Sequence, residues 1–341
     1  MHDRVWYLSV PKSFFEDARS AGPFEFLLAI SFSFEYVLTN LLFVPFMSGA
    51  AYNGDMATVT FGFSAQSDEA RHMTLGLEIV KFLLEQHEDN VPIVQEWIDK
   101  WFWRGTRLLS IVGMMMDYML PNKVMSWKEA WETYFEEAGG ALFKDLSRYG
   151  IRMPKYSDVI VKEKEHISHQ AWWIFYNFGH AAGFHTWIPT DEEMDWLSEK
   201  YPDTFDKYYR PMFERYIALQ EKGERYYSET LPLICQTCQI PLGFTDIEGG
   251  NPHVYTHKTS EYNGEIFHTC SDGCKEIFDA QPEKYIQAWL PVNQILQGNC
   301  GGPDLESILR DYYNFNVGAD NLDIEGSPDQ ERWRKWKGHV A

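Results

Sequence analysis

FSFEYVLTNLLFVPF at residues 32–46 and SAQSDEARHM at residues 64–73 are the stretches that decide how this sequence is interpreted. In the first stretch Glu35 is the sole charge, and no other charged residue lies between Glu25 and Asp55. A carboxylate among apolar side chains is costly unless it is neutralised, paired or bound to a metal. Glu35 is therefore a candidate functional residue before any motif is considered.

The second stretch contains a Glu-x-x-His motif, formed by Glu69 and His72. Apolar periodicity predicts helices over residues 24–47 and 57–89, and helical spacing puts the two side chains of the motif on one face. Glu35 lies 34 residues before Glu69, which is enough for a helix, a connection and a return. In four-helix di-iron carboxylate proteins, each half of the site uses a Glu from one helix and a Glu-x-x-His from the next. Carboxylates and imidazoles are suitable ligands for iron. Glu35 followed by the Glu-x-x-His motif therefore predicts half of a di-iron site.

The uncharged run from Tyr36 to Gly54 is long enough to span a bilayer. Against a span, Asn40, Pro45 and Asn53 interrupt the run, and no cluster of Lys or Arg flanks either end. The alternative is a helix that is hydrophobic on all sides because it is buried in a large helical domain. We favour the buried helix and predict no membrane association.

Two further Glu-x-x-His motifs begin at Glu163 and Glu265. Glu129 lies 34 residues before Glu163, so a second half-site in the same chain can be imagined. The sequence around Glu129 and Glu163 is dense in charge, which is typical of solvated helix faces. Glu265 falls in a stretch with strand character. The apolar flanks therefore favour the first motif as the metal site.

The chain has 341 residues, with 30 Lys and Arg against 50 Asp and Glu, so its formal net charge is −20. Such a field repels phosphate backbones and anionic lipid headgroups, so neither nucleic acid nor a membrane is the expected partner. Aromatic residues make up 16% of the chain and apolar residues 45%, enough for a large packed interior. The opening residues, MHDRVWYLSV, lack the features of an export signal, so we expect a cytoplasmic protein.

The first part of the chain has helical character throughout. Beyond the two helices above, further helices are predicted over 92–119, 126–146, 157–180, 191–199 and 204–229. After Pro232 the segments shorten and turn signals appear. We therefore predict a helical domain at 1–232, a compact module at 233–290 and an extended C-terminal arm at 291–341.

Four of the five cysteines form two close pairs in the compact module. The pairs are Cys235 with Cys238 and Cys270 with Cys274. Two knuckles of this spacing suit a closed, structural zinc site with four thiolate ligands, and four reduced structural thiols are the alternative. Cys300 has no evident partner. The module is predicted to contain two strands and a short helix, at 253–257, 265–269 and 272–280.

The two stretches quoted first resemble the second half of the di-iron site in the large oxygenase subunit of bacterial multicomponent monooxygenases. Over essentially its whole length, the chain most resembles the phenol hydroxylase type. In the compact module, CQTCQIPLGF and YNGEIFHTCSDGCKEIFDAQPEKY resemble the YHS domain. The resemblance implies a mainly α fold, in which an incomplete ferritin-like di-iron helical domain precedes a small α+β, cysteine-rich YHS-like module.

The resemblance also implies roles for residues at matching positions. The expected ligands of one iron ion are Glu35, Glu69 and His72. The polar residues expected beside the oxygen-binding face are Thr39, Asn40 and Gln66. The expected lining of the substrate pocket is Ile30, Phe34 and Phe43. Asp68 and Arg71 are expected to orient a ligand histidine, as metal sites of this kind require.

By this resemblance the complete enzyme hydroxylates phenol or a related aromatic to a catechol, with O2 and electrons from NADH. The implied partners are smaller hydroxylase subunits, a small regulatory protein and a separate flavin and iron–sulfur reductase. Family members carry an earlier Glu and an earlier Glu-x-x-His, whereas residues 1–34 here contain only Glu16 and Glu25 as glutamates and His2 as histidine. The chain is therefore expected to be a fragment that lacks the first iron half-site and does not turn over alone.

Two other classes of function remain open. A different ferritin-like di-iron enzyme, such as an acyl desaturase or a radical-generating reductase subunit, would use the same ligand types. The thiolate module and the adjacent Thr39 and Asn40 argue against that class. A zinc-bearing structural or interaction subunit would keep the helices without the iron chemistry. The metal content of the purified protein distinguishes these interpretations, since bound iron supports an enzyme and zinc alone supports a scaffold.

Overall fold

The computed structural model describes residues 9–120, 123–181, 189–222, 235–240 and 258–286. The chain divides into two compact units, one of residues 14–168 and one of residues 1–13 with 169–341. The predicted domain boundaries near residues 232 and 290 lie outside the described residues, and so does the predicted arm at 291–341. The division into three domains therefore stays a prediction.

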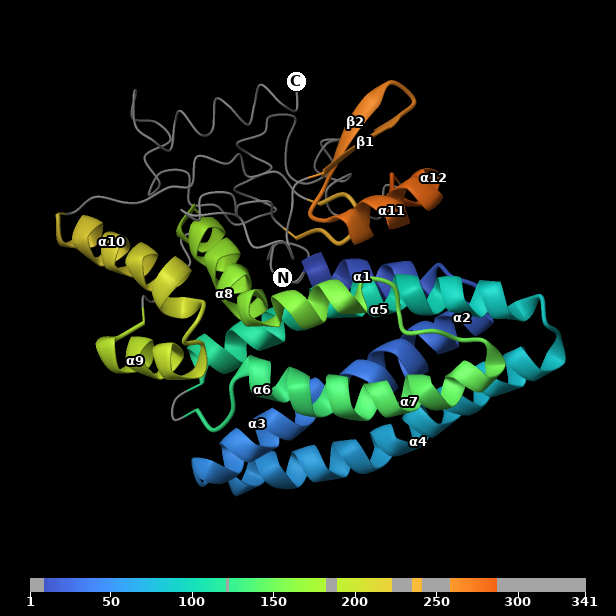
Figure 1. Ribbon diagram of the computed structural model, residues 1–341, viewed down its shortest axis with the longest axis horizontal. Coiled ribbons are helices and arrows are strands. Elements are labelled where there is room, and N and C mark those ends of the chain that lie inside the picture. Colours follow the sequence, from blue (N-terminus) through green and yellow to red (C-terminus); the bar gives the residue numbers. More distant parts are fainter. Residues whose placement is uncertain (1–8, 121–122, 182–188, 223–234, 241–257, 287–341) are drawn as a thin grey trace. The chain divides into compact units, whose positions relative to one another are not determined.

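Long helices that run side by side make up the unit of residues 14–168 (Figure 1). Its regular elements are the end of α1 (Ser9–Arg19), α2 (Pro23–Leu27), the π-helical segment η3 (Leu28–Tyr36), α3 (Asn40–Tyr52), α4 (Met56–Gln86), α5 (Asn90–Met114), η4 (Met115–Met119), α6 (Trp127–Trp131), η5 (Glu132–Glu137), α7 (Ala138–Leu146), η6 (Ser147–Tyr149) and the start of α8 (Ser157–Ala181). The segment η3 packs against both α4 and α5, and α3 packs against α4. The π-helical segment thus lies among the longest helices of the unit.

Side-chain caps fix where two of these helices begin. At the start of α4, Asp55 accepts a hydrogen bond from the backbone N–H of Thr58 at 3.0 Å. Hydrogen bonds from the Thr58 hydroxyl and backbone lower the pKa of Asp55 below its ordinary value. Ser126 and Glu129 form a capping box at the start of α6. Both arrangements satisfy backbone N–H groups that have no partner within the helix.

Aromatic side chains fill the interior of this unit. Trp101 and Phe102 of α5, Trp127 and Trp131 of α6, and Phe135 of η5 are all buried. The ring centroids of Trp131 and Phe135 lie 4.7 Å apart, and those of Phe102 and Phe135 lie 5.1 Å apart. Each such side chain removes about 150–250 Å² from water. The rings of Phe102 and Phe135 therefore pack α5 against η5.

The described part of the other unit combines helices with a β-hairpin. Its elements are the start of α1, the rest of α8, α9 (Asp191–Lys200), η7 (Phe205–Tyr209), α10 (Arg210–Glu221), β1 (Lys258–Tyr262), β2 (Glu265–Thr269), α11 (Asp272–Ala280) and α12 (Pro282–Tyr285). β1 and β2 pair antiparallel around a turn at Asn263 and Gly264, whose φ angles are 53° and 80°. Positive φ at both positions is what a two-residue hairpin turn requires. Phe267 of β2 packs on Phe278 of α11, with ring centroids 5.0 Å apart.

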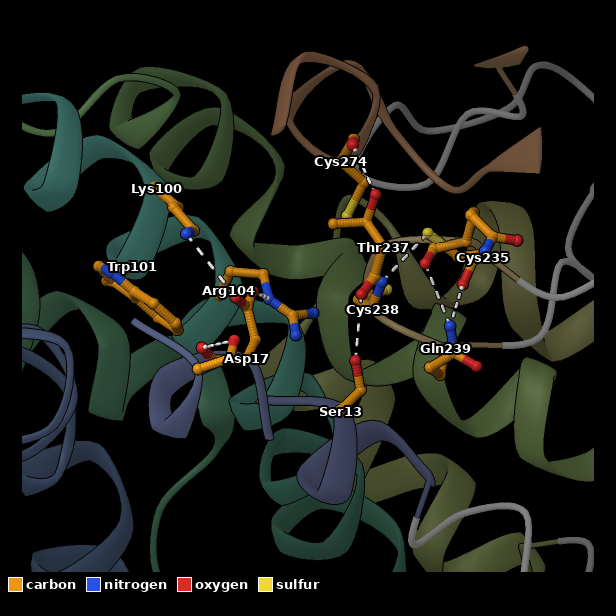
Figure 2. Close-up of polar contacts among 12 residues, drawn as sticks. Ser13, Asp17, Lys100, Trp101, Arg104, Cys235, Thr237, Cys238, Gln239 and Cys274 are labelled. Atoms are coloured by element: carbon orange, nitrogen blue, oxygen red, sulfur yellow. Dashed lines mark hydrogen bonds and ion pairs between the residues drawn. The ribbon is translucent and has the colours of Figure 1, made fainter. Parts of the chain in front are cut away.

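A buried cluster of charges links α1 and α2 to α5 within the first unit (Figure 2). Asp17 accepts a hydrogen bond from Nε of Arg104 at 3.1 Å, and both side chains are fully buried. Nζ of Lys100 lies 3.7 Å from Asp17 and 2.9 Å from Glu25. Glu25 also accepts a hydrogen bond from Nε1 of Trp101 at 3.0 Å. Opposite charges at these distances offset the cost of removing each group from water.

We expect Asp17→Ala to lower the free energy of unfolding by about 3–5 kcal/mol, because Arg104 would stay buried without this carboxylate. Urea unfolding followed by circular dichroism measures the change. Glu16→Ala on the same helix is the control, since Glu16 pairs with Arg19, whose side chain is 76% exposed. The control should cost about 1 kcal/mol or less. Equal losses in the two variants would contradict a stabilising role for the buried pair.

The predicted mainly helical fold is confirmed. The helix predicted over 24–47 is observed as α2, η3 and α3, and the helix predicted over 57–89 is α4. α1 has no counterpart among the predicted helices. None of the described helices combines the length and apolar character that crossing a bilayer demands.

The remaining predicted elements are largely observed as well. Residues 92–119 are α5 with η4, 126–146 are α6, η5 and α7, and 157–180 and 191–199 are α8 and α9. The helix predicted over 204–229 is η7 with α10 up to Glu221, and residues after 222 lie outside the described ones. The second predicted strand and the short helix are β2 and α11. The strand predicted at 253–257 lies outside the described residues, and the described partner of β2 is β1 at 258–262.

Candidate metal centres

Glu35 lies in η3, where the helix is wider than an α-helix. The Thr39 hydroxyl donates to the carbonyl oxygen of Phe34, five residues earlier, at 3.0 Å. The Glu35 side chain is 15% exposed, and its Oε2 is buried without a hydrogen-bonding partner. A buried carboxylate oxygen in this state is costly, and a bound cation would remove the cost.

Glu69 and His72 bring their side chains from α4 to Glu35. Nδ1 of His72 lies 3.3 Å from Oε2 of Glu69 and 3.6 Å from Oε1 of Glu35. One potential ligand atom from each of the three residues lies within 4.8 Å of the other two. The structure therefore brings together the three residues predicted as iron ligands. We call them the carboxylate–histidine cluster.

Burial and charge both act on Glu35. Burial raises the pKa of Glu35 above its ordinary value, and the negative charge of Glu69 raises it further. The charge of His72 and a hydrogen bond from the side chain of Ser31 lower the pKa in part. A divalent cation beside these groups would instead favour their charged forms. Ser31 was not predicted, and its only signal in the sequence is a hydroxyl placed four residues before the lone carboxylate.

The donors of this cluster fit an iron ion. Two carboxylates and one imidazole are the ligand types of di-iron carboxylate sites, and Glu35 offers a buried oxygen that lacks another partner. Three protein ligands leave further coordination positions free. The His72 side chain is 53% exposed, so the cluster is open on the His72 side. The donor types are those expected for half of a di-iron site.

The other predicted polar residues lie in different surroundings. Thr39 is buried and Gln66 is half-buried. Asn40 begins α3, but its side chain lies outside the described part of the structure. Asp68 and Arg71 are exposed and form an ion pair with each other at 3.0 Å. Their described contact is thus with one another rather than with His72, and their support of a ligand stays a prediction.

The residues predicted to line a substrate pocket are Ile30, Phe34 and Phe43, and all three are half-buried. The Phe34 ring lies 5.2 Å from the ring of Phe14 and 6.3 Å from that of Phe15. Phe34 therefore belongs to an aromatic group that joins η3 to α1. A joint role of the three in substrate binding stays a prediction.

The other Glu-x-x-His motifs have different roles in the described structure. Glu129 is engaged in the α6 cap, where it accepts a hydrogen bond from the backbone N–H of Ser126 at 2.8 Å. Glu163 is 7% exposed, so the prediction of a solvated face is wrong at this residue. The charged residues of this stretch form ion pairs within the unit instead of a solvated face, since Nζ of Lys164 lies 2.7 Å from Glu136 and 2.9 Å from Glu132. Among the described residues, the candidate metal-binding groups are the carboxylate–histidine cluster and the four cysteines.

The four cysteines form a buried cluster of reduced thiols. All four are fully buried: Cys235, Cys238, Cys270 and Cys274. The sulfur of Cys270 lies 3.6 Å from that of Cys238 and 3.5 Å from that of Cys274. A disulfide would need about 2.05 Å. A tetrahedral zinc site with bonds of about 2.3 Å has its sulfurs about 3.8 Å apart, close to the observed spacing. Burial raises the pKa of the Cys238 and Cys270 thiols well above the ordinary value in the absence of a metal.

Hydrogen bonds fix the loop that follows Cys235 (Figure 2). Gln239 adopts a positive φ of 64°, and its side-chain N–H donates to the carbonyl of Cys235 at 3.2 Å. The Thr237 hydroxyl donates to the carbonyl of Cys274 at 2.7 Å, which ties the two knuckles together. Ser13 donates to the carbonyl of Thr237 at 3.1 Å. The thiols are therefore held in place by contacts that sequence spacing alone did not reveal.

Comparison with known proteins gives the two regions separate matches. Residues 1–87 match the family described as methane, phenol and alkene hydroxylase, and residues 253–289 match the YHS domain. The oxygenase component DmpN of phenol 2-monooxygenase from Pseudomonas sp. (strain CF600) is 68% identical over 340 residues. That match covers 100% of this chain and 65% of DmpN, so the chain spans about two thirds of the length of this relative.

More distant relatives and a solved structure agree. The alpha subunit of the oxygenase component of an alkene monooxygenase system, from Xanthobacter autotrophicus (strain ATCC BAA-1158 / Py2), is 28% identical, over 90% of this chain and 61% of that protein. The crystal structure of xenon-pressurized phenol hydroxylase from Pseudomonas sp. OX1 is 71% identical with a TM-score of 0.84. The match covers 98% of this chain and 68% of the chain in that crystal structure. The resemblance to the phenol hydroxylase oxygenase component is confirmed, and the chain belongs to the methane, phenol and alkene hydroxylase family.

Proposed function

We propose that this chain is part of the oxygenase component of a di-iron monooxygenase that hydroxylates phenol or a related aromatic to a catechol. The observation that carries the proposal is the carboxylate–histidine cluster, whose three donor groups lie within 4.8 Å of one another on two packed helices. The 68% identity to the oxygenase component of a phenol 2-monooxygenase favours phenol as the substrate class.

In this proposal each element of the site has a distinct task. Glu35, Glu69 and His72 hold one iron ion between η3 and α4. When bound, the di-iron centre supplies the activation of O2 for insertion of one oxygen atom into the aromatic ring. Ile30 and Phe34 share η3 with Glu35 and would form an apolar wall for the ring, together with Phe43. Thr39 and Gln66, with Asn40, would supply the polar groups on the oxygen-binding side.

A second polypeptide segment would complete the site. Large apolar side chains share one side of α4 because they repeat at multiples of seven residues, and they are exposed: Phe61 at 72%, Leu75 at 51% and Phe82 at 53%. His72 lies one turn from Leu75 and is half-exposed. A helical segment packed along this side would cover the apolar stripe and bring further carboxylates and an imidazole to the second iron. We therefore expect the chain alone to be inactive.

The cysteine cluster is proposed to hold a structural zinc ion. Four thiolates fill a tetrahedral coordination sphere and leave no open position for chemistry. Burial of all four sulfurs supports this closed role, because substrate has no access to a fully buried ion. Zinc would thus stabilise the YHS domain without taking part in hydroxylation.

Electrons for the reaction would come from NADH through a separate flavin and iron–sulfur reductase. Smaller hydroxylase subunits and a small regulatory protein would complete the assembly in the cytoplasm. The net charge of −20 disfavours nucleic acid and anionic membranes as partners. The curated relatives are themselves named as components of larger systems, which supports a multicomponent enzyme.

Metal analysis together with turnover tests this function. The complete oxygenase carrying this sequence is purified with its partners, its iron and zinc are measured, and phenol is supplied with NADH and reductase. We expect about two iron ions per site, as in other di-iron carboxylate proteins, about one zinc ion, and catechol as product. The isolated chain should retain zinc and form no catechol.

Two results would contradict the proposal in different ways. Zinc without iron in the complete oxygenase would favour the scaffold interpretation. Iron with no conversion of phenol, but with desaturation of an acyl chain or generation of a protein radical, would favour another di-iron enzyme.

A further inference from the structure

Gly76 lies on the buried face of α4, one helical turn after His72. A Cβ atom at this position would lie 2.4 Å from the carbonyl carbon of Ser31, 2.5 Å from its oxygen and 2.7 Å from the backbone nitrogen of Phe32. All three are backbone atoms of η3. At this crossing α4 and the π-helical segment therefore touch backbone to backbone, which only a glycine allows.

A glycine inside a helix needs such a reason, because it destabilises the helix by about 0.5–1 kcal/mol relative to alanine. Gly62 offers a contrast on the same buried face of α4. A Cβ at Gly62 would meet only side-chain atoms of Met47, at 2.4 Å and 2.6 Å. A methionine side chain can turn aside, whereas the backbone of a packed helix cannot. The requirement for glycine is therefore much stricter at position 76.

The crossing at Gly76 connects directly to the carboxylate–histidine cluster. Ser31, whose backbone meets Gly76, is buried and stands four residues before Glu35 in η3, and its hydroxyl is one of the groups that lower the pKa of Glu35. Glu69 and His72 lie seven and four residues before Gly76, on the same side of α4. The crossing at Gly76 therefore joins the two elements that carry the donor groups. Glu35 lies on η3, and Glu69 and His72 lie on α4.

We propose that Gly76 is a positioning residue, whose missing side chain sets the separation of α4 from η3 and so the distance from Glu35 to Glu69 and His72. Ser31 transmits this contact to Glu35 through its hydroxyl. The inference rests on the proposed iron-binding function of these three residues. It assigns to the helix crossing a role that is separate from ligation itself.

Gly76→Ala in the complete oxygenase tests the proposal. The added methyl group has to push α4 away from η3, which draws Glu35 away from the other two donors. We expect the affinity for ferrous iron to fall about 10- to 100-fold, as for other residues that orient metal ligands. The Mössbauer spectrum of the iron that still binds should change as well. Thermal unfolding is recorded in parallel, since a purely structural role would lower Tm and leave the spectrum unaltered.

Two further variants sharpen the test. Gly62→Ala adds the same methyl group to the same helix and should keep the parent's iron affinity and spectrum. Ser31→Ala leaves the backbone contact in place and removes only the hydroxyl next to Glu35. It should weaken iron binding by about tenfold. Ser31→Ala also decides the matter if Gly76→Ala does not fold.

The outcomes separate this inference from the proposed function. Unchanged iron affinity and spectrum in folded Gly76→Ala would overturn the positioning role, as would an unchanged Ser31→Ala if the first variant does not fold. Retention of iron by Glu69→Ala would instead reject the metal site itself. Loss of iron in Glu69→Ala with no effect in Gly76→Ala would leave the proposed function intact.

Discussion

Glu69→Ala in the complete oxygenase is expected to abolish phenol hydroxylation while the protein stays folded. The substitution removes one of three ligands, so iron should be lost from the carboxylate–histidine cluster and kcat should fall at least about 1,000-fold, or about 4 kcal/mol in activation free energy. The fold should tolerate the change because the Glu69 side chain is 23% exposed and alanine favours helices. Its negative charge also raises the pKa of Glu35, so its removal relieves a repulsion in the metal-free protein.

Iron content, catechol formation and thermal unfolding are measured together for this variant. Glu78→Ala is the matched control, because Glu78 is also a glutamate on α4 but is 61% exposed and pairs with Lys81 at 2.8 Å. The control should keep iron and activity, with a stability change within about 0.5 kcal/mol. Wild-type iron content and rate in Glu69→Ala would rule this residue out as a ligand.

Cys270→Ser is expected to release zinc and to unfold the YHS domain without changing iron content. The sulfur of Cys270 lies 3.6 Å from that of Cys238 and 3.5 Å from that of Cys274. Structural zinc sites contribute about 10–16 kcal/mol of apparent binding free energy. The hydrophobic core around Phe278 and Tyr285 is too small to replace that contribution, so loss of the ion should expose the hairpin and α11.

Zinc analysis and limited proteolysis measure this effect. We expect new cleavage sites within residues 258–286 and iron loading equal to that of the parent. Cys300→Ser removes the thiol outside the two knuckles and should leave both zinc content and the cleavage pattern unchanged. Full zinc content in Cys270→Ser would show that the four thiols are structural without a metal.

The helices and the three clustered donors could be predicted from the sequence for the same reason. Long apolar periodicity leaves few alternatives to packed helices, and a single carboxylate in such a run needs a partner. The observed distances among Glu35, Glu69 and His72 agree with that argument. The hairpin turn could also be predicted from the sequence, since Asn263-Gly264 is a strong turn signal.

Features that depend on distant contacts could not be predicted. Asp17 pairs with Arg104, 87 residues away, and no local pattern reveals that partner. Glu163 lies in charge-dense sequence, yet it is 7% exposed. The π-helical geometry of η3, which packs against α4 and α5, was not predicted either. Hydrophobic pattern therefore predicts which elements form, while tertiary contacts decide which polar groups become buried.

The choice of two carboxylates and one imidazole has a consequence for how the protein acquires its metal. Zinc generally binds such donors more tightly than ferrous iron does, so affinity alone does not select the correct ion. If these three side chains hold iron as proposed, growth with scarce iron would fill them with zinc, and the product would be folded and inert. Correct metallation then depends on the supply of iron during biosynthesis. Recombinant preparations made without added iron would therefore underestimate the activity of the enzyme.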